Sequence, residues 1–280
     1  MHKIISVAVA SRDRTRCLAE FTKSFAKTTG RINRPQLTIL HDAPTDTWAV
    51  NEFKLQLDDM WEGDNKTIWE PYGPSPIEHI ILPEKSSLTE LWNWCVMLAP
   101  TDWVLICNDD VTFNHGWLEY LEQQIATDKY DMIHLFHYGG MCIHKRLILK
   151  MGWFDENFRG GSFEDIDYQL RISESKLTDR VDRSHDFLRK EGSVEVGHFM
   201  NHHRNVQANG SWDGKNNADY MCEKWGRKSP YDYRIPSFRK RRETDWHPAY
   251  TKKYETKYGI KSQIKKINKE KVGFPIKIYL

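Results

Sequence analysis

The stretch WVLICNDDVTF, residues 103–113, places two adjacent carboxylates directly after a short apolar run. Asn108, Asp109 and Asp110 follow five mostly apolar residues, which predict a strand in the core. Two neighbouring carboxylates at a buried strand end repel each other, so they require positive charge beside them. A divalent cation held together with a phosphate-bearing ligand would supply that charge. The motif therefore predicts a site for a phosphorylated ligand, and its structural alternative is a solvated turn.

A second set of acids begins the predicted helix in FEDIDYQLR, residues 163–171. Glu164 and Asp167 are spaced i and i+3 and share one face of that helix, whereas Asp165 lies about 100° around it. Acidic residues also favour helix N-termini because they interact with the helix dipole. That preference accounts for one or two of these acids without any function.

Apolar strands alternate with helical patterns in the first half of the chain. Strands are predicted at 4–10, 36–42, 78–84 and 102–110, and helices at 11–29, 46–62, 86–100 and 115–128. Ser11 resembles a helix cap, and Ser86 or Ser87 caps the third helix. The alternation predicts a parallel, doubly wound α/β sheet, in which ligands bind beyond the carboxyl ends of the strands. Asp42 and the NDD motif fall at such ends.

The second half of the chain has a different pattern. Two short strands are predicted around Gly139 and Gly140, followed by a Gly-rich loop and a helix that starts at Glu164. The segment GSVEVGHFMNHHRN, residues 192–205, is predicted as a strand that enters a histidine cluster. A lone histidine at a strand end is usually a structural hydrogen-bonding group. Beside strand-terminal acids, however, a histidine of this cluster becomes a candidate metal ligand. The three candidates are His198, which we favour, His202 and His203.

The charge distribution is uneven. From Gly226 to Leu280 there are 16 Lys/Arg against 5 Asp/Glu, whereas the residues before Gly226 carry 25 Lys/Arg against 34 Asp/Glu. An acidic body with a basic C-terminal segment predicts that this segment meets an anion such as nucleic acid, a membrane surface or a phosphorylated ligand. The alternative is a solvated surface helix.

Cysteine usage and the lack of targeting segments predict a cytoplasmic protein. The five cysteines are odd in number and contain no CxxC pair, which is typical of reduced thiols. The apolar run near the N-terminus is too short for a signal peptide, and no stretch approaches the roughly 20 apolar residues of a transmembrane helix.

Several motifs carry a family resemblance in a fixed order. The N-terminal ones are VAVASRDR, TILHDAPTDT and SSLTELWNWCVMLA, and the later ones are NDD, GWFDENFRGGSFEDIDYQLR and His198. Together they resemble the glycosyltransferases of the GT-A fold, especially the inverting group called family 2. The resemblance covers roughly residues 4–205. It implies an α/β fold with a Rossmann-like, mostly parallel twisted sheet flanked by helices.

For the donor side, the resemblance implies a nucleotide sugar, UDP-linked, bound with Mn²⁺ or Mg²⁺. The residues expected to contact this donor are Ser11, Arg12, Asp42, Asn93, Asn108 and Asp109. Asp110 is expected to ligate the metal together with His198, and the metal would neutralise the leaving diphosphate. Many relatives have a third Asp where this chain has Asn108, which lowers the negative charge offered to a cation.

For the acceptor side, the resemblance makes Asp165 the general base that deprotonates an acceptor hydroxyl. Glu164 would bind the acceptor or a sugar hydroxyl, and Asp167 would hold the loop, paired with Arg171 at i+4. The residues expected to bind the acceptor are Trp153, Gly160, Gly161 and Asp167. Attack from the face opposite the leaving diphosphate predicts inversion at the sugar.

We divide the chain into a catalytic domain at 1–205 and a basic, aromatic-rich extension at 206–280. Within the first, 1–113 is the nucleotide-sugar-binding half and 114–205 the acceptor half. The acceptor is a glycan or a hydroxymethylated DNA base. DNA is considered because the RK, RKRR and KK clusters of residues 227–253 alternate with aromatic residues, as suits nucleic-acid binding.

Two other functions stay open. One is a nucleotidyltransferase that makes nucleotide sugars, although the turn in VAVASRDR lacks the glycines that a triphosphate loop usually has. The other is a non-catalytic nucleic-acid- or carbohydrate-binding module.

Overall fold

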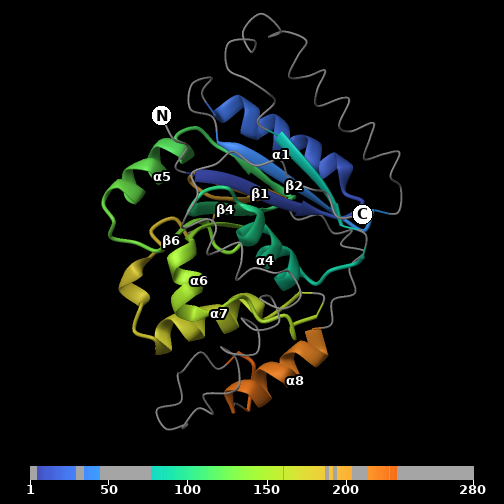
Figure 1. The fold of residues 1–280 in the computed structure, drawn as a ribbon, viewed down its shortest axis with the longest axis vertical. Coiled ribbons are helices and arrows are strands. Elements are labelled where there is room, and N and C mark those ends of the chain that lie inside the picture. The colour runs from blue at the N-terminus through green and yellow to red at the C-terminus, as the bar shows by residue number, and fades with distance from the viewer. Residues whose placement is uncertain are drawn as a thin grey trace, which may run out of the picture.

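The computed structural model describes residues 5–29, 35–44, 77–82, 84–159, 161–186, 189–191, 194–203, 214–226 and 228–231 (Figure 1). Three predictions fall outside these residues: the helix over 46–62, the role of Gly160, and the basic segment beyond residue 231.

Among the described residues, the centre of the molecule is a seven-stranded sheet in the order β3-β2-β1-β4-β7-β6-β8. Its strands are β1 (Ile5–Ser11), β2 (Gln36–Asp42), β3 (Ile77–Leu82), β4 (Trp103–Asn108), β6 (Met132–Phe136), β7 (Gly140–His144) and β8 (Val181–Asp182). The first four strands in the order are parallel, β7 runs antiparallel to both of its neighbours, and β8 pairs parallel with β6. The predicted α/β class with a mostly parallel sheet is therefore confirmed.

Helices cover both faces of this sheet (Figure 1). They are α1 (Thr15–Thr28), α4 (Leu88–Leu98), α5 (Trp117–Ala126), α6 (Lys145–Met151) and α7 (Glu164–Glu174). Because successive strand residues point to opposite faces, Val7 and Val9 pack with α1 and α5, while Ala8 packs with α4, α6 and α7. Both faces of β1 are thus buried, which explains its continuous apolar sequence.

The helix starts follow from local sequence. Ser87 forms a capping box with Glu90, so the predicted cap of α4 is confirmed. The predicted cap at Ser11 is wrong, because Ser11 is the last residue of β1 and the N-cap of α1 is Arg14. Residues 12–14 form the turn between strand and helix, which becomes important at the candidate site.

A second, antiparallel sheet has the order β5-β11-β10-β9. Its strands are β5 (Val111–Phe113), β9 (Arg189–Glu191), β10 (Val194–Val196) and β11 (Met200–His203). The single strand predicted over 192–205 is therefore a hairpin, closed by a hydrogen bond of 2.9 Å from the Gly197 N–H to the Met200 carbonyl. His198 lies in the turn of this hairpin rather than on a strand.

Helix α8 (Gly214–Trp225) belongs to the predicted C-terminal extension, yet it packs beside α7 (Figure 1). Met221 and Trp225 of α8 form a buried cluster with Phe158, Phe163 and Leu170. The start of the extension is thereby attached to the predicted acceptor half, and the division of the chain at 205/206 stays a prediction.

Two further observations concern the cysteines and the apolar character of the helices. All five cysteines are free thiols. Among the described residues, no helix has the length and apolar character needed to cross a bilayer.

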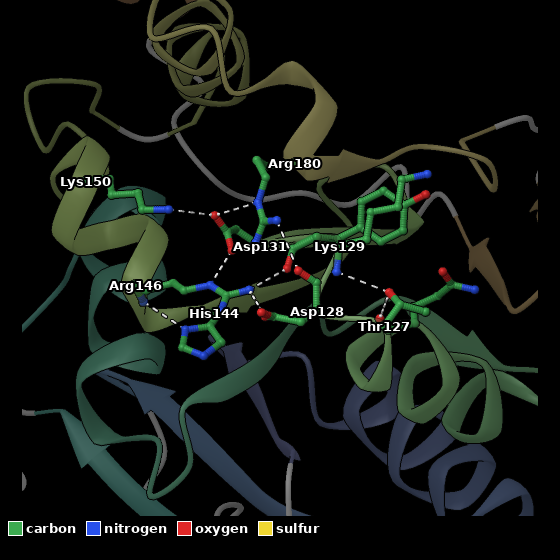
Figure 2. Close-up of polar contacts among 10 residues, drawn as sticks. Thr127, Asp128, Lys129, Asp131, His144, Arg146, Lys150 and Arg180 are labelled. Atoms are coloured by element: carbon green, nitrogen blue, oxygen red, sulfur yellow. Dashed lines mark hydrogen bonds and ion pairs between the residues drawn. The ribbon is translucent and has the colours of Figure 1, made fainter.

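Asp131, just before β6, connects several elements through one buried carboxylate (Figure 2). It pairs with Arg146 and with Lys150 at 3.1 Å on α6, and with Arg180 at 2.7 Å before β8. Burial alone would raise the pKa of Asp131, but hydrogen bonds from Arg180, Arg146 and Lys150 outweigh it and hold the pKa well below its ordinary value. The contact fixes α6 and the 178–180 turn against the edge of the sheet.

We expect Asp131→Asn to lower the free energy of unfolding by about 2–4 kcal/mol, because it leaves three cations around a buried site without their counter-charge. A carboxylate with a depressed pKa stabilises the fold above its unfolded pKa of about 3.9, and that contribution is lost as the pH falls. Urea titrations at pH 7 and pH 3.5 should therefore show a smaller difference between variant and wild type at the lower pH.

Asp128→Asn is the matched control for this substitution. Asp128 pairs with the same Arg146 at 2.6 Å but its side chain is 77% exposed, so solvent screens the pair and the change should have a much smaller effect than Asp131→Asn. Equal effects of the two substitutions would contradict the importance of the buried carboxylate.

Candidate active site

The candidate site lies where the parallel strands end. Because β2, β1 and β4 are adjacent and parallel, Asp42, Ser11 and Asn108 lie at the same edge of the sheet. Ligands in sheets of this kind bind at the carboxyl ends of the strands. The structure thus brings together Ser11, Asp42 and Asn108, three of the residues predicted to contact the donor.

Arg12 joins three elements at this edge. Its guanidinium pairs with the Asp42 carboxylate and lies 3.3 Å from the Ser86 carbonyl, just before α4. The Ser86 N–H in turn donates to Asp42 at 2.9 Å. Burial raises the pKa of Asp42 even though Ser86 and Arg12 favour its charged form. A buried, paired carboxylate is therefore held between β1, β2 and α4.

Asp109 and Asp110 form the turn between β4 and β5, and Arg14 spans them. One guanidinium nitrogen lies 2.6 Å from Asp109 Oδ1 and the other 2.9 Å from Asp110 Oδ2. Ser11 Oγ donates to the second oxygen of Asp109 at 2.7 Å. The positive charge that the two carboxylates require is supplied here by an arginine of the protein itself.

The pKa values of the two carboxylates are shifted in opposite directions. Burial raises the pKa of Asp109 to about 6, although Arg14 and Ser11 favour its charged form. Burial also opposes the charge of Asp110, but His202 and Arg14 outweigh burial and hold its pKa below the ordinary value. Asp110 is therefore the more firmly ionised member of the pair.

His202, rather than His198, is the histidine beside Asp110. His202 Nε2 lies 3.2 Å from Asp110 Oδ1, and its Nδ1 lies 3.2 Å from Glu195 Oε2. His198 is exposed in the β10–β11 turn and stacks on His185, with ring centroids 5.2 Å apart. The expected pairing of His198 with Asp110 is not formed, because the hairpin turns at Gly197 and places the next strand against β5.

The residues do not fit a divalent metal as they are arranged. All four oxygens of the acidic pair contact side chains of the protein, namely those of Arg14, Ser11 and His202. Both ring nitrogens of His202 face carboxylates. Within the part of the chain that the structure describes, no three His, Cys, Asp or Glu side chains gather closely enough to hold a metal together.

The β6–β7 hairpin connects this region to the predicted catalytic helix. The Asn108 N–H donates to the Gly139 carbonyl at 3.0 Å. The neighbouring Tyr138 interacts electrostatically with Asp165 at the start of α7. Asn108, at the end of β4, and the predicted base therefore flank the same hairpin.

Glu164 and Asp165 have different environments, as the helix geometry predicted. The Glu164 side chain is buried, its Oε2 has no hydrogen-bond partner among the described residues, and burial followed by repulsion from Asp165 raises its pKa to about 7. Asp165 is half-buried and accepts a hydrogen bond from the Ile166 N–H at 2.7 Å. Burial raises its pKa, while His137 and Arg183 favour the charged form. Burial therefore raises the pKa of both carboxyls.

Asp167 lies on the buried face and forms the predicted pair with Arg171, at 3.0 Å. It also accepts a hydrogen bond from Trp225 Nε1 at 2.9 Å and pairs with Lys224 at 2.7 Å. These contacts fasten α8 to α7 and give Asp167 a positioning role. Its expected contact with the acceptor has no support in this geometry, since the side chain is fully buried.

Asn93 also holds the structure together. Its buried amide donates to the Phe154 carbonyl and accepts from the Phe154 N–H, both at 3.0 Å, and donates to Glu156 at 3.2 Å. Asn93 thus fixes the loop after α6 to α4, and its expected contact with the donor stays a prediction. Trp153, an expected acceptor residue, is half-buried in the same loop.

The loop before α7 has a strained backbone. Gly161, Ser162 and Phe163 have φ values of 128°, 109° and 70°. Positive φ in consecutive residues costs energy unless the surroundings impose it, and such strain gathers at functional sites. Asn217 of α8 imposes it here, because its amide donates to the carbonyls of Gly161 and Ser162 at 3.3 and 3.1 Å.

Sequence reasoning missed Arg14, Glu195 and Asn217. Arg14 is visible in the SRDRTR turn, but its contact with the NDD motif depends on β1 lying beside β4. Asn217 belongs to a helix whose signal was present, because Ala218, Met221 and Trp225 recur at spacings of three and four residues.

The comparisons with known proteins do not identify a family. No protein-family model and no curated protein matches this chain. Solved structures that match include residues 1–349 of S. aureus TarS, with a TM-score of 0.46 and 16% identity over 63% of this chain and 56% of that chain. TarS 1–349 in complex with UDP-GlcNAc matches with a TM-score of 0.44 and 14% identity over 60% of this chain and 53% of that chain. The chain thus spans about half of these structures, and likeness at this level assigns neither family nor activity.

We expect Glu164→Gln to stabilise the fold at pH 8 relative to wild type, and to do so much less at pH 5. A carboxyl whose pKa rises from about 4.5 unfolded to about 7 folded binds its proton more tightly in the native state, so stability falls as the pH rises between these values. The amide does not ionise, and the gain at pH 8 should reach up to about 3 kcal/mol.

Denaturant titrations at the two pH values measure this difference. Glu122→Gln, at an exposed carboxyl on α5, is the control and should follow wild type at both. A pH-independent difference for Glu164→Gln would mean that Glu164 is ionised throughout.

Proposed function

We propose that this chain is a glycosyltransferase that moves a sugar from a nucleotide sugar, UDP-linked, to an acceptor hydroxyl with inversion. The observation that supports it best is the position of Asp165 at the start of α7, beside the hairpin that also contacts Asn108. One hairpin is flanked by the candidate base and by a charged strand edge that suits a phosphate. Sugar transfer from a nucleotide sugar needs both.

The donor side of the proposal rests on the carboxyl ends of β1, β2 and β4. Asp42 with Arg12, and Asp109 with Ser11, form paired groups at adjacent strand ends. The family resemblance of the sequence assigns these positions to the nucleotide and the sugar. Arg12 and Arg14 are each about a quarter exposed, so cationic groups are present where a diphosphate would lie.

In the proposed reaction, Asp165 accepts the proton of the acceptor hydroxyl as its oxygen bonds to the anomeric carbon. The bond from that carbon to the diphosphate breaks on the opposite face, and the nucleoside diphosphate leaves with the electron pair. A pKa raised by burial makes Asp165 a stronger base than an exposed aspartate. Glu164, with its pKa near 7, is suited to hydrogen-bond a hydroxyl of the acceptor or sugar.

No step of this proposal uses a metal. The sequence resemblance implies Mn²⁺ or Mg²⁺ at Asp110, but the oxygens of the acidic pair already contact Arg14, Ser11 and His202.

A panel of nucleotide sugars tests the proposal by thermal shift and by slow donor hydrolysis. A donor at 100 times its dissociation constant stabilises the fold by about 2.7 kcal/mol. If no nucleotide sugar of the panel stabilises the fold, the proposal is wrong. Pyrophosphate release from a nucleoside triphosphate would favour the nucleotidyltransferase instead.

Asp165→Asn should reduce transfer by about 10²- to 10⁴-fold and leave the dissociation constant of the donor unchanged, because the base acts only on the acceptor. Initial rates and calorimetric titration with UDP measure the two effects separately. Glu164→Gln is the matched control, with a smaller loss of rate. A larger loss for Glu164→Gln would exchange the two roles, and no loss for either would favour a binding module.

A hydroxymethylated DNA base is a second candidate acceptor. Tyr231, in the basic segment 227–253, is 66% exposed and packs on Phe163, two residues before Asp165. The described start of that segment therefore contacts the N-cap residue of α7, the helix that contains the proposed base. Lys and Arg neutralise phosphates and aromatic rings stack on bases, and the target base would be extruded from the duplex to reach Asp165.

If DNA is the acceptor, duplex binding should weaken steeply with salt, by a log–log slope of about −0.9 for each phosphate neutralised. Replacing Arg239, Lys240, Arg241 and Arg242 with alanine should flatten the slope and leave UDP binding unchanged. Fluorescence anisotropy between about 50 and 200 mM salt measures it.

The control replaces Lys261, Lys265, Lys266 and Lys269, which removes the same charge outside the segment. Equal slopes for both variants, or no binding by wild type at about 50 mM salt, would favour a glycan acceptor.

A further inference from the structure

The turn after β4 contains two carboxylates whose charges are compensated entirely from within the chain. Asp109 contacts Arg14 at 2.6 Å and the Ser11 hydroxyl at 2.7 Å. Asp110 contacts Arg14 at 2.9 Å and His202 at 3.2 Å. Each of the four oxygens therefore has a protein group within contact distance, and Arg14 is common to both residues.

The fold positions Arg14 for this contact. It is the N-cap residue of α1, in the turn that follows β1, and β1 pairs in parallel with β4. The turns after β1 and β4 therefore lie side by side at the same sheet edge. Guanidinium nitrogens diverge in a rigid fork, so one arginine can bind two neighbouring carboxylates at once.

The same oxygens are the ones that a divalent cation would use. Mg²⁺ in phosphate-binding sites is usually held by one or two carboxylates together with the phosphates of the ligand. A cation that entered here would have to displace a guanidinium that makes two charge-assisted hydrogen bonds, at Asp109 and at Asp110. Buried charge pairs are costly to separate, because the freed charge loses its partner without regaining full hydration.

We propose that Arg14 is the resident cation of this site: it takes the place of a divalent metal between Asp109 and Asp110, and the chain binds its nucleoside diphosphate without one. The identity of the ligand rests on the proposed function, whereas the exclusion of metal from the acidic pair does not. Arg14, with a quarter of its side chain exposed, then offers its remaining surface to the diphosphate.

Calorimetric titration of Mn²⁺ into the full-length protein without nucleotide is the first test. Wild type should show no saturable binding below about 1 mM, the weak end of the range for protein cation sites. Arg14→Ala frees both carboxylates and should gain at least a tenfold tighter Mn²⁺ site, which is lost again when Asp110→Asn is added. Arg14→Lys keeps the charge and should not gain the site.

Arg16→Ala is the matched control. It removes the same charge two residues later, from an exposed position on α1, and should not create Mn²⁺ binding. Circular dichroism of each variant verifies the fold, and Arg14→Gln replaces Arg14→Ala if the alanine variant is not folded. The inference is wrong if wild type binds Mn²⁺ as tightly as Arg14→Ala or Arg14→Gln does. It is also wrong if neither of these two variants gains a Mn²⁺ site.

The second test compares UDP binding in EDTA and in Mn²⁺. Wild type should bind UDP with the same dissociation constant in both, whereas Arg14→Ala should bind it only with Mn²⁺ present. A loss of more than about tenfold for wild type in EDTA would overturn the inference. If UDP does not bind in either condition, the proposed function is at fault, and the Mn²⁺ titration alone decides the role of Arg14.

Discussion

The contact of Arg14 with Asp109 and Asp110 is the interaction on which the candidate site depends. Two adjacent carboxylates between β4 and β5 would otherwise repel each other in a region with little water. Arg14 compensates both carboxylates in the turn between β4 and β5. The strand that follows this turn, β5, pairs with β11, and this pairing brings His202 to Asp110. The second sheet is therefore joined to the first through a compensated charge cluster as well as through apolar packing.

Much of the fold is encoded locally, and those parts were predictable. The β2 strand occupies the predicted residues, and the capping box at Ser87 starts α4 at the expected position. Period-two and helical patterns identify such elements because each must bury one face. The order of strands is not local. Nothing in the sequence near Arg14 indicates that β1 lies beside β4, so its contact with NDD could not be derived.

In the histidine cluster, too, a contact between distant segments decides which residue reaches the site. His198 and His202 are four residues apart, and the choice between them depends on where the chain reverses. A turn at Gly197 leaves His198 exposed and places His202 on the strand that pairs with β5. The loop before α7 was recognised as Gly-rich, but its positive φ values are imposed by Asn217, more than fifty residues later. Features of the site that depend on distant contacts were the ones that sequence patterns could not supply.

The two acids at the start of α7 illustrate how position on one helix turn separates chemical roles. Glu164 shares the buried face with Asp167, so burial raises its pKa to about 7. Asp165 lies about 100° around the helix, where burial also raises its pKa, while the charges of His137 and Arg183 favour its ionised form. When neighbouring carboxyls have pKa values pushed apart, the one that stays ionised is suited to accept a proton and the one that stays protonated is suited to donate a hydrogen bond. This difference in environment supports the proposed roles of Asp165 as the base and of Glu164 as a hydrogen-bond donor.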